Sequence, residues 1–374
     1  MRRPLSWFVL FLATLPGMAG AQLRLPPLDI RVPIAPIGVM NGGRTHLVYE
    51  LRVTNVGRRA IGLMRIEVAA GATTLASFDG DALRQMMVRV ADSGDARVIE
   101  PGRQSLIYLA VSAATAPETL SHRFLLAAPD SLAGPASDTV AGFPVAVDSR
   151  PAPVLEAPLE DGPWLAANGP GNQSGHRRTV IPLEGRARIP QRFATDWVKF
   201  GPDGRLWQGD STRNENWYGY RAPLRAVGAG TVVAIKDGIP ENVPLAPNRA
   251  VPITLETVGG NHVILDLGGG VFAFYAHLVP GSLRVRVGDR VRPGQIVGLL
   301  GNSGNSDAPH LHFHLGDRAS PLATEGLPFV FADYQLLGRA PGFSPEPWRP
   351  TGTPAARRRE LPFEDEVVRF PRRR

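Results

Sequence analysis

The chain has 374 residues, which is too long for one small core, so two or three compact units are expected. Hydrophobic residues make up 43% and charged residues 20%, which excludes a largely disordered chain or a multi-span membrane protein, and the absence of cysteine excludes disulfides and thiolate metal sites. The net charge of +7 is concentrated at the two ends of the chain, so the nearly neutral body is not that of a dedicated nucleic-acid-binding protein.

Residues 1–21 have the pattern of a secretory signal peptide. Arg2 and Arg3 precede an apolar run, and Ala19-Gly20-Ala21 matches an A-x-A cleavage site. A membrane anchor is the alternative, but it requires about 20 apolar residues. We therefore expect cleavage after Ala21 and a periplasmic or secreted protein without stable membrane insertion.

Short β-like runs separated by turn residues fill residues 22–148. Segments 46–54 and 106–111 alternate between apolar and polar residues at period two, which predicts an antiparallel β-sandwich of the immunoglobulin-like type. His46 and His122 stand alone in this region, so we expect both to be structural. A spacing role or the binding of a protein partner is the expectation for this domain.

Two proline-rich segments flank the next domain. Residues 149–175 combine proline with glycine, asparagine and serine, a composition typical of an extended linker, and we place the domain boundary there. Residues 336–374 are rich in proline and arginine, and we expect them to form a poorly ordered tail. The second domain therefore covers residues 176–335.

Most of the eight histidines lie in this second domain, and they are densest in Pro309-His310-Leu311-His312-Phe313-His314. In a β-strand, alternate side chains share a face, so His310, His312 and His314 would lie together while the apolar residues between them face a core. One imidazole could then bind a metal while its neighbour reaches the substrate. We expect His314 at the rim of such a site or behind it.

A second histidine-bearing strand is predicted at residues 271–278. Period-two alternation places Tyr275 and His277 on one of its faces, and the glycines at 268–270 predict a hairpin with the strand that begins at His262. We expect Tyr275 to serve packing rather than catalysis. His262 is expected to be structural.

Four motifs follow one another along this part of the chain. They are Tyr275-Ala276-His277-Leu278, the segment 287–295, Gly301-x-x-Gly304 and Pro309-His310-Leu311-His312-Phe313. In this order they resemble the LytM/lysostaphin-type zinc endopeptidases of peptidoglycan, over about residues 176–330. The resemblance implies a small antiparallel β fold of the duplicated-hybrid-motif type and peptidoglycan peptides as substrates.

The resemblance also implies a zinc centre with one ion per chain. It assigns Asp196 and His312 as metal ligands and His277 and His310 as the catalytic histidines. The family usually has His-x-x-x-Asp, whereas this chain has Arg192 four residues before Asp196. A guanidinium is effectively never deprotonated, so Arg192 cannot bind zinc.

His176 is the candidate to replace the missing ligand. Residues 176–182 can turn at 184–186 and pair back along 187–196, which would set His176 opposite Asp196. A surface histidine is the alternative for this position. With His176, zinc would have three nitrogen and oxygen ligands and one open position, as catalytic zinc sites require.

The sequence thus predicts an all-β, secreted or periplasmic zinc metalloendopeptidase that hydrolyses peptide bonds of peptidoglycan. Because Arg192 stands where the family usually has a zinc ligand, a second hypothesis is a catalytically degenerate LytM-like domain that binds the wall or activates another hydrolase. A third hypothesis is a general protein-processing peptidase with the same site and another substrate.

Overall fold

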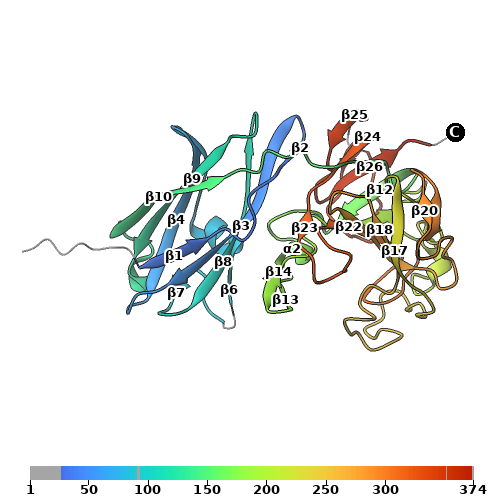
Figure 1. Ribbon diagram of the computed structural model, residues 1–374, viewed down its shortest axis with the longest axis horizontal. Helices are drawn as coiled ribbons and strands as arrows, with labels where there is room; N and C mark the ends of the chain where they lie inside the picture. The colour runs from blue at the N-terminus through green and yellow to red at the C-terminus, as the bar shows by residue number, and fades with distance from the viewer. Residues whose placement is uncertain (1–26, 91–92, 351, 373–374) are drawn as a thin grey trace, which may run out of the picture.

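The structure is a computed structural model that describes residues 27–90, 93–350 and 352–372. The signal peptide expected at 1–21 lies outside these residues. Within the described part of the chain, no helix has both the length and the apolar character that crossing a membrane would require. Two β-rich lobes, one from each half of the sequence, lie side by side in Figure 1.

The N-terminal lobe contains two antiparallel sheets. The first has the order β1-β3-β8-β6, with β2 also paired to β3, and consists of β1 (Leu28–Arg31), β2 (Gly38–Asn41), β3 (Arg44–Asn55), β6 (Met87–Arg89) and β8 (Gln104–Ala113). The second has the order β10-β9-β4-β5, with β7 paired to β4, and consists of β4 (Ile61–Ala70), β5 (Thr73–Asp79), β7 (Val98–Ile99), β9 (Thr119–Ala127) and β10 (Asp138–Ala146). Two short helical segments complete the lobe, α1 (Gly80–Met86) and η1 (Pro129–Ser131).

Both sheets bury one face in a shared core. Leu47, Tyr49 and Leu51 alternate along β3 toward this core, where they join Ile66 of β4 and Phe124 of β9. The period-two pattern of the sequence therefore produces a two-layered β-sandwich, as expected. Its likeness to immunoglobulin domains stays a prediction.

The C-terminal lobe is built on one twelve-stranded sheet, and Figure 1 shows its strands at the right. The order is β11-β24-β26-β12-β15-β22-β19-β18-β17-β20, with β23 paired to β22 and β25 to β24. The strands are β11 (Val154–Leu155), β12 (Asp161–Ala167), β15 (Thr195–Lys199), β17 (Gly230–Lys236), β18 (Asn261–Asp266), β19 (Phe272–Leu278), β20 (Arg290–Val291), β22 (Leu311–Gly316), β23 (Gly326–Leu327), β24 (Val330–Arg339), β25 (Ala355–Glu360) and β26 (Glu366–Phe370).

Smaller elements surround this sheet. They are α2 (Gly175–Arg178), η2 (Asn214–Asn216), the hairpin of β13 (Ile181–Leu183) with β14 (Arg186–Arg188), and the pair of β16 (Pro223–Arg225) with β21 (Ile296–Leu299). The helix α2 and the hairpin β13–β14 lie between the two lobes in Figure 1.

The segments expected to be a linker and a disordered tail both contribute strands to the large sheet. β12 lies within residues 149–175 and pairs with β15, while β26 lies within residues 336–374 and is inserted between β12 and β24. Both predictions were wrong because they followed the average composition, which is rich in proline and glycine in the first segment and in proline and arginine in the second. The few apolar residues in these segments, such as Leu165 and Val368, are fully buried and decide the fold.

Phe370 in β26 shows how far the fold depends on the C-terminal strand. Its ring is 1% exposed and its centroid lies 5.2 Å from those of both Trp197 and Phe331. Truncating a buried phenylalanine costs roughly 3–5 kcal/mol, so we expect Phe370→Ala to reduce the free energy of unfolding in urea by about that amount. The exposed Arg358→Ala in β25 is the control, with an expected change within about 0.5 kcal/mol. Equal stability of both variants would contradict a structural role for β26.

The two lobes are in direct contact. The side-chain amide of Asn41 donates to the carbonyl of Leu361 over 2.9 Å, and the Gly42 amide donates to the Glu360 carboxylate over 2.7 Å. These bonds connect the β2–β3 hairpin to the end of β25, and β2 lies beside β25 in Figure 1. A third contact involves Arg52 of β3, whose Nη2 donates to Ala187 O over 2.7 Å.

Candidate active site

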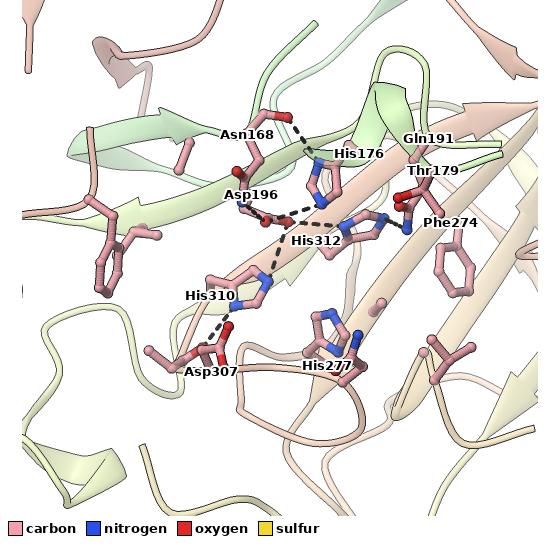
Figure 2. Close-up of a pocket in the computed structure, with 18 of the residues that line it drawn as sticks. Asn168, His176, Thr179, Gln191, Asp196, Phe274, His277, Asp307, His310 and His312 are labelled. Carbon is pink, nitrogen blue, oxygen red and sulfur yellow. Dashed lines mark hydrogen bonds and ion pairs between the residues drawn. The ribbon is translucent and has the colours of Figure 1, made fainter. Parts of the chain in front are cut away.

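The metal ligands and catalytic histidines predicted from the sequence lie around one cavity of about 710 Å³ in the C-terminal lobe. Its lining includes His176, Asp196, His277, His310 and His312, and Figure 2 shows their side chains directed toward a common centre. Residues of the expected tail, Glu364 and Asp365, also line it. The structure therefore brings together side chains that are more than one hundred positions apart in the sequence.

Two adjacent strands position the centre of this group. Asp196 of β15 is paired directly with His312 of β22, so their side chains leave the sheet next to each other. Leu311 and Phe313 are fully buried in the core on the opposite face of β22. The alternation predicted for the histidine-rich strand is thus confirmed.

The carboxylate of Asp196 contacts three histidines. Its Oδ1 lies 2.9 Å from Nδ1 of His312 and 3.3 Å from Nε2 of His310, while its Oδ2 lies 3.3 Å from Nε2 of His176. Burial alone would raise the pKa of Asp196, but the charges and hydrogen bonds of His176 and His310 hold it well below the usual value. Asp196 is therefore ionised at neutral pH.

Three cavity histidines share one orientation. In each, Nδ1 faces a backbone carbonyl: His176 faces Asn168 O at 2.9 Å, His277 faces Ser303 O at 2.8 Å, and His310 faces Ala308 O at 2.8 Å. A carbonyl oxygen only accepts hydrogen bonds, so Nδ1 carries the proton in every case. In a neutral ring of this tautomer the lone pair is on Nε2, and in His176 and His310 Nε2 is the atom that faces the Asp196 carboxylate.

His312 has the opposite orientation. Its Nδ1 faces Asp196, and its Nε2 lies 3.0 Å from Nδ1 of His314, a residue that is 1% exposed. Burial lowers the pKa of His314 well below its usual value, so this ring is neutral and can form a hydrogen bond with His312 Nε2. His314 therefore lies behind His312 rather than at the rim of the cavity.

The prediction that Tyr275 and His277 share a face of β19 was wrong. Tyr275 is buried in the core, where its hydroxyl accepts a hydrogen bond from the Val227 amide over 2.8 Å. A β-bulge shifts the register between the pairs Asn261–Leu278 and Val263–Tyr275, and His277 has a φ of 68°. The bulge interrupts the alternation and turns the His277 ring into the cavity.

His176 lies close to Asp196, although not by the expected route. The hairpin β13–β14 has only three residue pairs, and β15 pairs with β12 and β22 instead. The short helix α2 carries His176 to the cavity. Burial alone would lower the pKa of His176, but the charge of Asp196 and its hydrogen bond raise it above the usual value.

Several residues that support this group were not predicted from the sequence. Asn168 donates from Nδ2 to Oδ2 of Asp196 over 2.9 Å and also accepts from His176 through its carbonyl, yet it lies in the expected linker. Arg192 is buried and its guanidinium contacts the carboxylates of Glu50 and Glu325. Nothing in the local sequence pattern indicated Glu50, because it lies in the other lobe.

Comparisons with known proteins find a related family for part of this lobe. Residues 218–323 match the model of peptidase family M23. Over these residues the chain is similar to the M23 family. This confirms the resemblance to LytM/lysostaphin-type peptidases. The matched region includes His277, His310 and His312, whereas His176 and Asp196 precede it.

Individual relatives match short parts of the chain. Glycyl-glycine endopeptidase ALE-1 of Staphylococcus capitis is 41% identical over 75 residues, which are 19% of this chain and 20% of that protein. Peptidoglycan DD-endopeptidase ShyA of Vibrio cholerae is 38% identical over 63 residues, or 17% of this chain and 14% of that protein. The chain therefore spans only a fifth or less of the length of these relatives.

Among solved structures, the chain is similar to the catalytic domain of lysostaphin from Staphylococcus simulans. It is 24% identical in sequence to this chain, with a TM-score of 0.22. The similarity covers 34% of this chain and 88% of that chain.

Proposed function

We propose that this protein is a zinc-dependent endopeptidase that hydrolyses peptide bonds of bacterial peptidoglycan in the periplasm or outside the cell. One observation carries the proposal: potential ligand atoms of His176, Asp196 and His312 lie within 4.8 Å of one another. Beside them, His277 and His310 supply two further imidazoles at the same cavity. The names of the relatives ALE-1 and ShyA, both endopeptidases, support the substrate class.

The donor set fits zinc. Two imidazoles and one carboxylate, with a fourth position left open, form a ligand set that catalytic zinc sites use. The residues that hydrogen-bond to these ligands also fit a zinc site. Asn168 O fixes the tautomer of His176, and Nδ1 of His314 faces Nε2 of His312, the nitrogen that points away from Asp196. When bound, zinc supplies Lewis acidity toward the scissile carbonyl and makes water more acidic.

His277 and His310 are the proposed proton-transfer residues. Their ring centroids lie 4.8 Å apart, and both rings are fixed by hydrogen bonds from Nδ1 to backbone carbonyls. Burial lowers the pKa of His277 well below its usual value, so the ring is neutral and its Nε2 carries a lone pair.

His310 has the complementary property. Burial alone would lower its pKa, but the Asp196 carboxylate raises it above the usual value. Two neighbouring groups whose pKa values are shifted in opposite directions can divide the acid and base roles. We therefore assign His277 as the proton acceptor and His310 as the donor to the leaving amine.

A second function is favoured by one observation, the cation of Arg192 at the position of the usual first ligand. In that case the domain would bind the wall or activate another hydrolase without cleaving peptides itself. The position of His176 weakens this alternative, because its Nε2 lies 3.3 Å from the Asp196 carboxylate. With His176 as the third donor, the proposed metal site does not require a ligand at position 192.

Incubation of the purified protein with purified peptidoglycan tests the proposal. We expect soluble fragments with new amino termini in the presence of zinc, and none after chelation or with Asp196→Asn. Labelling of the new termini would identify the cleaved bond. A protein that binds zinc but releases no fragments would support the regulatory alternative, and cleavage of unrelated unfolded proteins at equal rates would support a general peptidase.

A further inference from the structure

A buried ion cluster joins the N-terminal lobe to the active-site cavity. Glu50 of β3 is 2% exposed, and its two carboxylate oxygens accept hydrogen bonds from different arginines of the C-terminal half. Oε1 accepts from Nε of Arg177 and Oε2 from Nε of Arg192, each over 2.8 Å. Burial alone would raise the pKa of Glu50, but the two guanidiniums lower it, so the carboxylate is charged.

Arg177 is inserted into the sheet of the N-terminal lobe. Besides Glu50, its Nη2 donates to the carbonyls of Tyr49 and Leu109, each over 2.8 Å. The guanidinium also lies over the ring of Tyr108, 5.5 Å from its centroid. This side chain is fully buried and fixes the backbone of α2 against β3 and β8.

His176 directly precedes Arg177 in α2. Successive residues of a helix point about 100° apart, so Arg177 can reach the N-terminal lobe while His176 reaches Asp196. The helix has only four residues and no side-chain cap at its N-terminus. So short a helix is not stable by its own hydrogen bonds, and its position depends on tertiary contacts such as that of Arg177.

Arg192 extends the same cluster toward Asp196. Its Nη2 donates to Glu325 over 3.1 Å and its Nη1 to the carbonyl of Gly326 over 3.2 Å, while Nε contacts Glu50. Only three residues separate Arg192 from Asp196. One carboxylate of the N-terminal lobe is therefore bonded both to the segment that carries His176 and to the segment that leads to Asp196.

We propose that Glu50 is a positioning residue for the metal site. Through Arg177 and Arg192 it fixes His176 relative to Asp196, so the N-terminal lobe is a structural part of the metal centre and not only a separate binding module. Glu50 touches neither metal nor substrate in this role. The inference rests on the proposed function, because it requires His176 and Asp196 to bind the same ion.

Zinc affinity and the spectrum of the cobalt-substituted protein test this role. Outer partners of metal ligands typically contribute 10- to 100-fold to affinity, and we expect Glu50→Gln to weaken zinc binding by about that factor in competition with a chelator. The visible absorption bands of bound Co²⁺ should shift, because they report the ligand geometry. Arg52→Ala is the matched control, since Arg52 lies in the same strand and also bonds across the interface, and it should change neither readout.

A second variant separates positioning from folding. Glu50→Gln leaves the buried guanidinium of Arg177 without its carboxylate and leaves Arg192 with Glu325 alone, which can unfold the protein. Arg177→Met removes the connection to α2 but keeps the Glu50–Arg192 pair, and we expect the same loss of zinc affinity with an unchanged near-ultraviolet dichroism spectrum.

The possible results are distinct. Wild-type zinc affinity and cobalt spectra in both variants would overturn the proposal. So would a loss of zinc that occurs only together with loss of the folded structure, since the cluster would then be purely structural. If the wild-type protein binds no zinc, the proposed function fails instead.

Discussion

Asp196→Asn should abolish tight zinc binding and peptidoglycan hydrolysis while the protein stays folded. Asparagine has the size of aspartate, so no cavity forms, but it lacks the charge that His176, His310 and His312 face. The loss of zinc affinity should exceed the roughly 10- to 100-fold effect typical of outer partners, because a ligand itself is removed. Zinc content after dialysis and the rate of fragment release measure both effects.

His262→Ala is the matched control for this experiment. His262 also lies in the large sheet, but its Nδ1 faces the carbonyl of Gly260 at 2.9 Å and its ring contacts Phe274 outside the donor group. We expect this variant to retain zinc and activity. Stoichiometric zinc in Asp196→Asn would mean that the ligand set is different from the one proposed. His176→Ala, which should also lose zinc, then shows whether α2 contributes a ligand at all.

The sequence predicted the histidine-rich strand correctly because alternation is a local property. His310, Leu311, His312 and Phe313 lie on the expected sides without reference to any other part of the chain. The shared face of Tyr275 and His277 was predicted wrongly because the orientation of His277 depends on a β-bulge in β19, which arises only when β19 pairs with β18. No pattern within residues 271–278 contains that information.

Average composition gave the wrong structure prediction for segments in which a few buried residues determine the fold although many of the others are exposed. In β26, Arg369 is exposed while Val368 and Phe370 on either side of it are buried, so an arginine-rich sequence still forms a strand between two others. Glu50 was missed for a related reason. Glu50 alternates with the core residues Tyr49 and Leu51, so it lies on the other face of β3. The sequence pattern of that face is typical of a solvent-exposed surface, but in the structure the C-terminal lobe buries Glu50.

The proposed division of roles in the cavity predicts that His310→Gln separates catalysis from metal binding. Nε2 of His310 lies 3.3 Å from Asp196, but the group of potential metal donors consists of His176, Asp196 and His312. Glutamine can form hydrogen bonds but cannot transfer a proton at neutral pH. Because positioned proton transfer contributes typically 10²- to 10⁴-fold, we expect kcat to fall by about that factor.

Zinc content distinguishes this outcome from the loss of a ligand. His310→Gln should retain one zinc ion per chain, unlike Asp196→Asn, and peptidoglycan should still bind to the protein. Loss of zinc in His310→Gln would make His310 a ligand rather than a proton donor. Full activity would remove it from the mechanism and would leave His277, whose ring is fixed by Ser303 O, as the single proton-transfer residue of the proposed site.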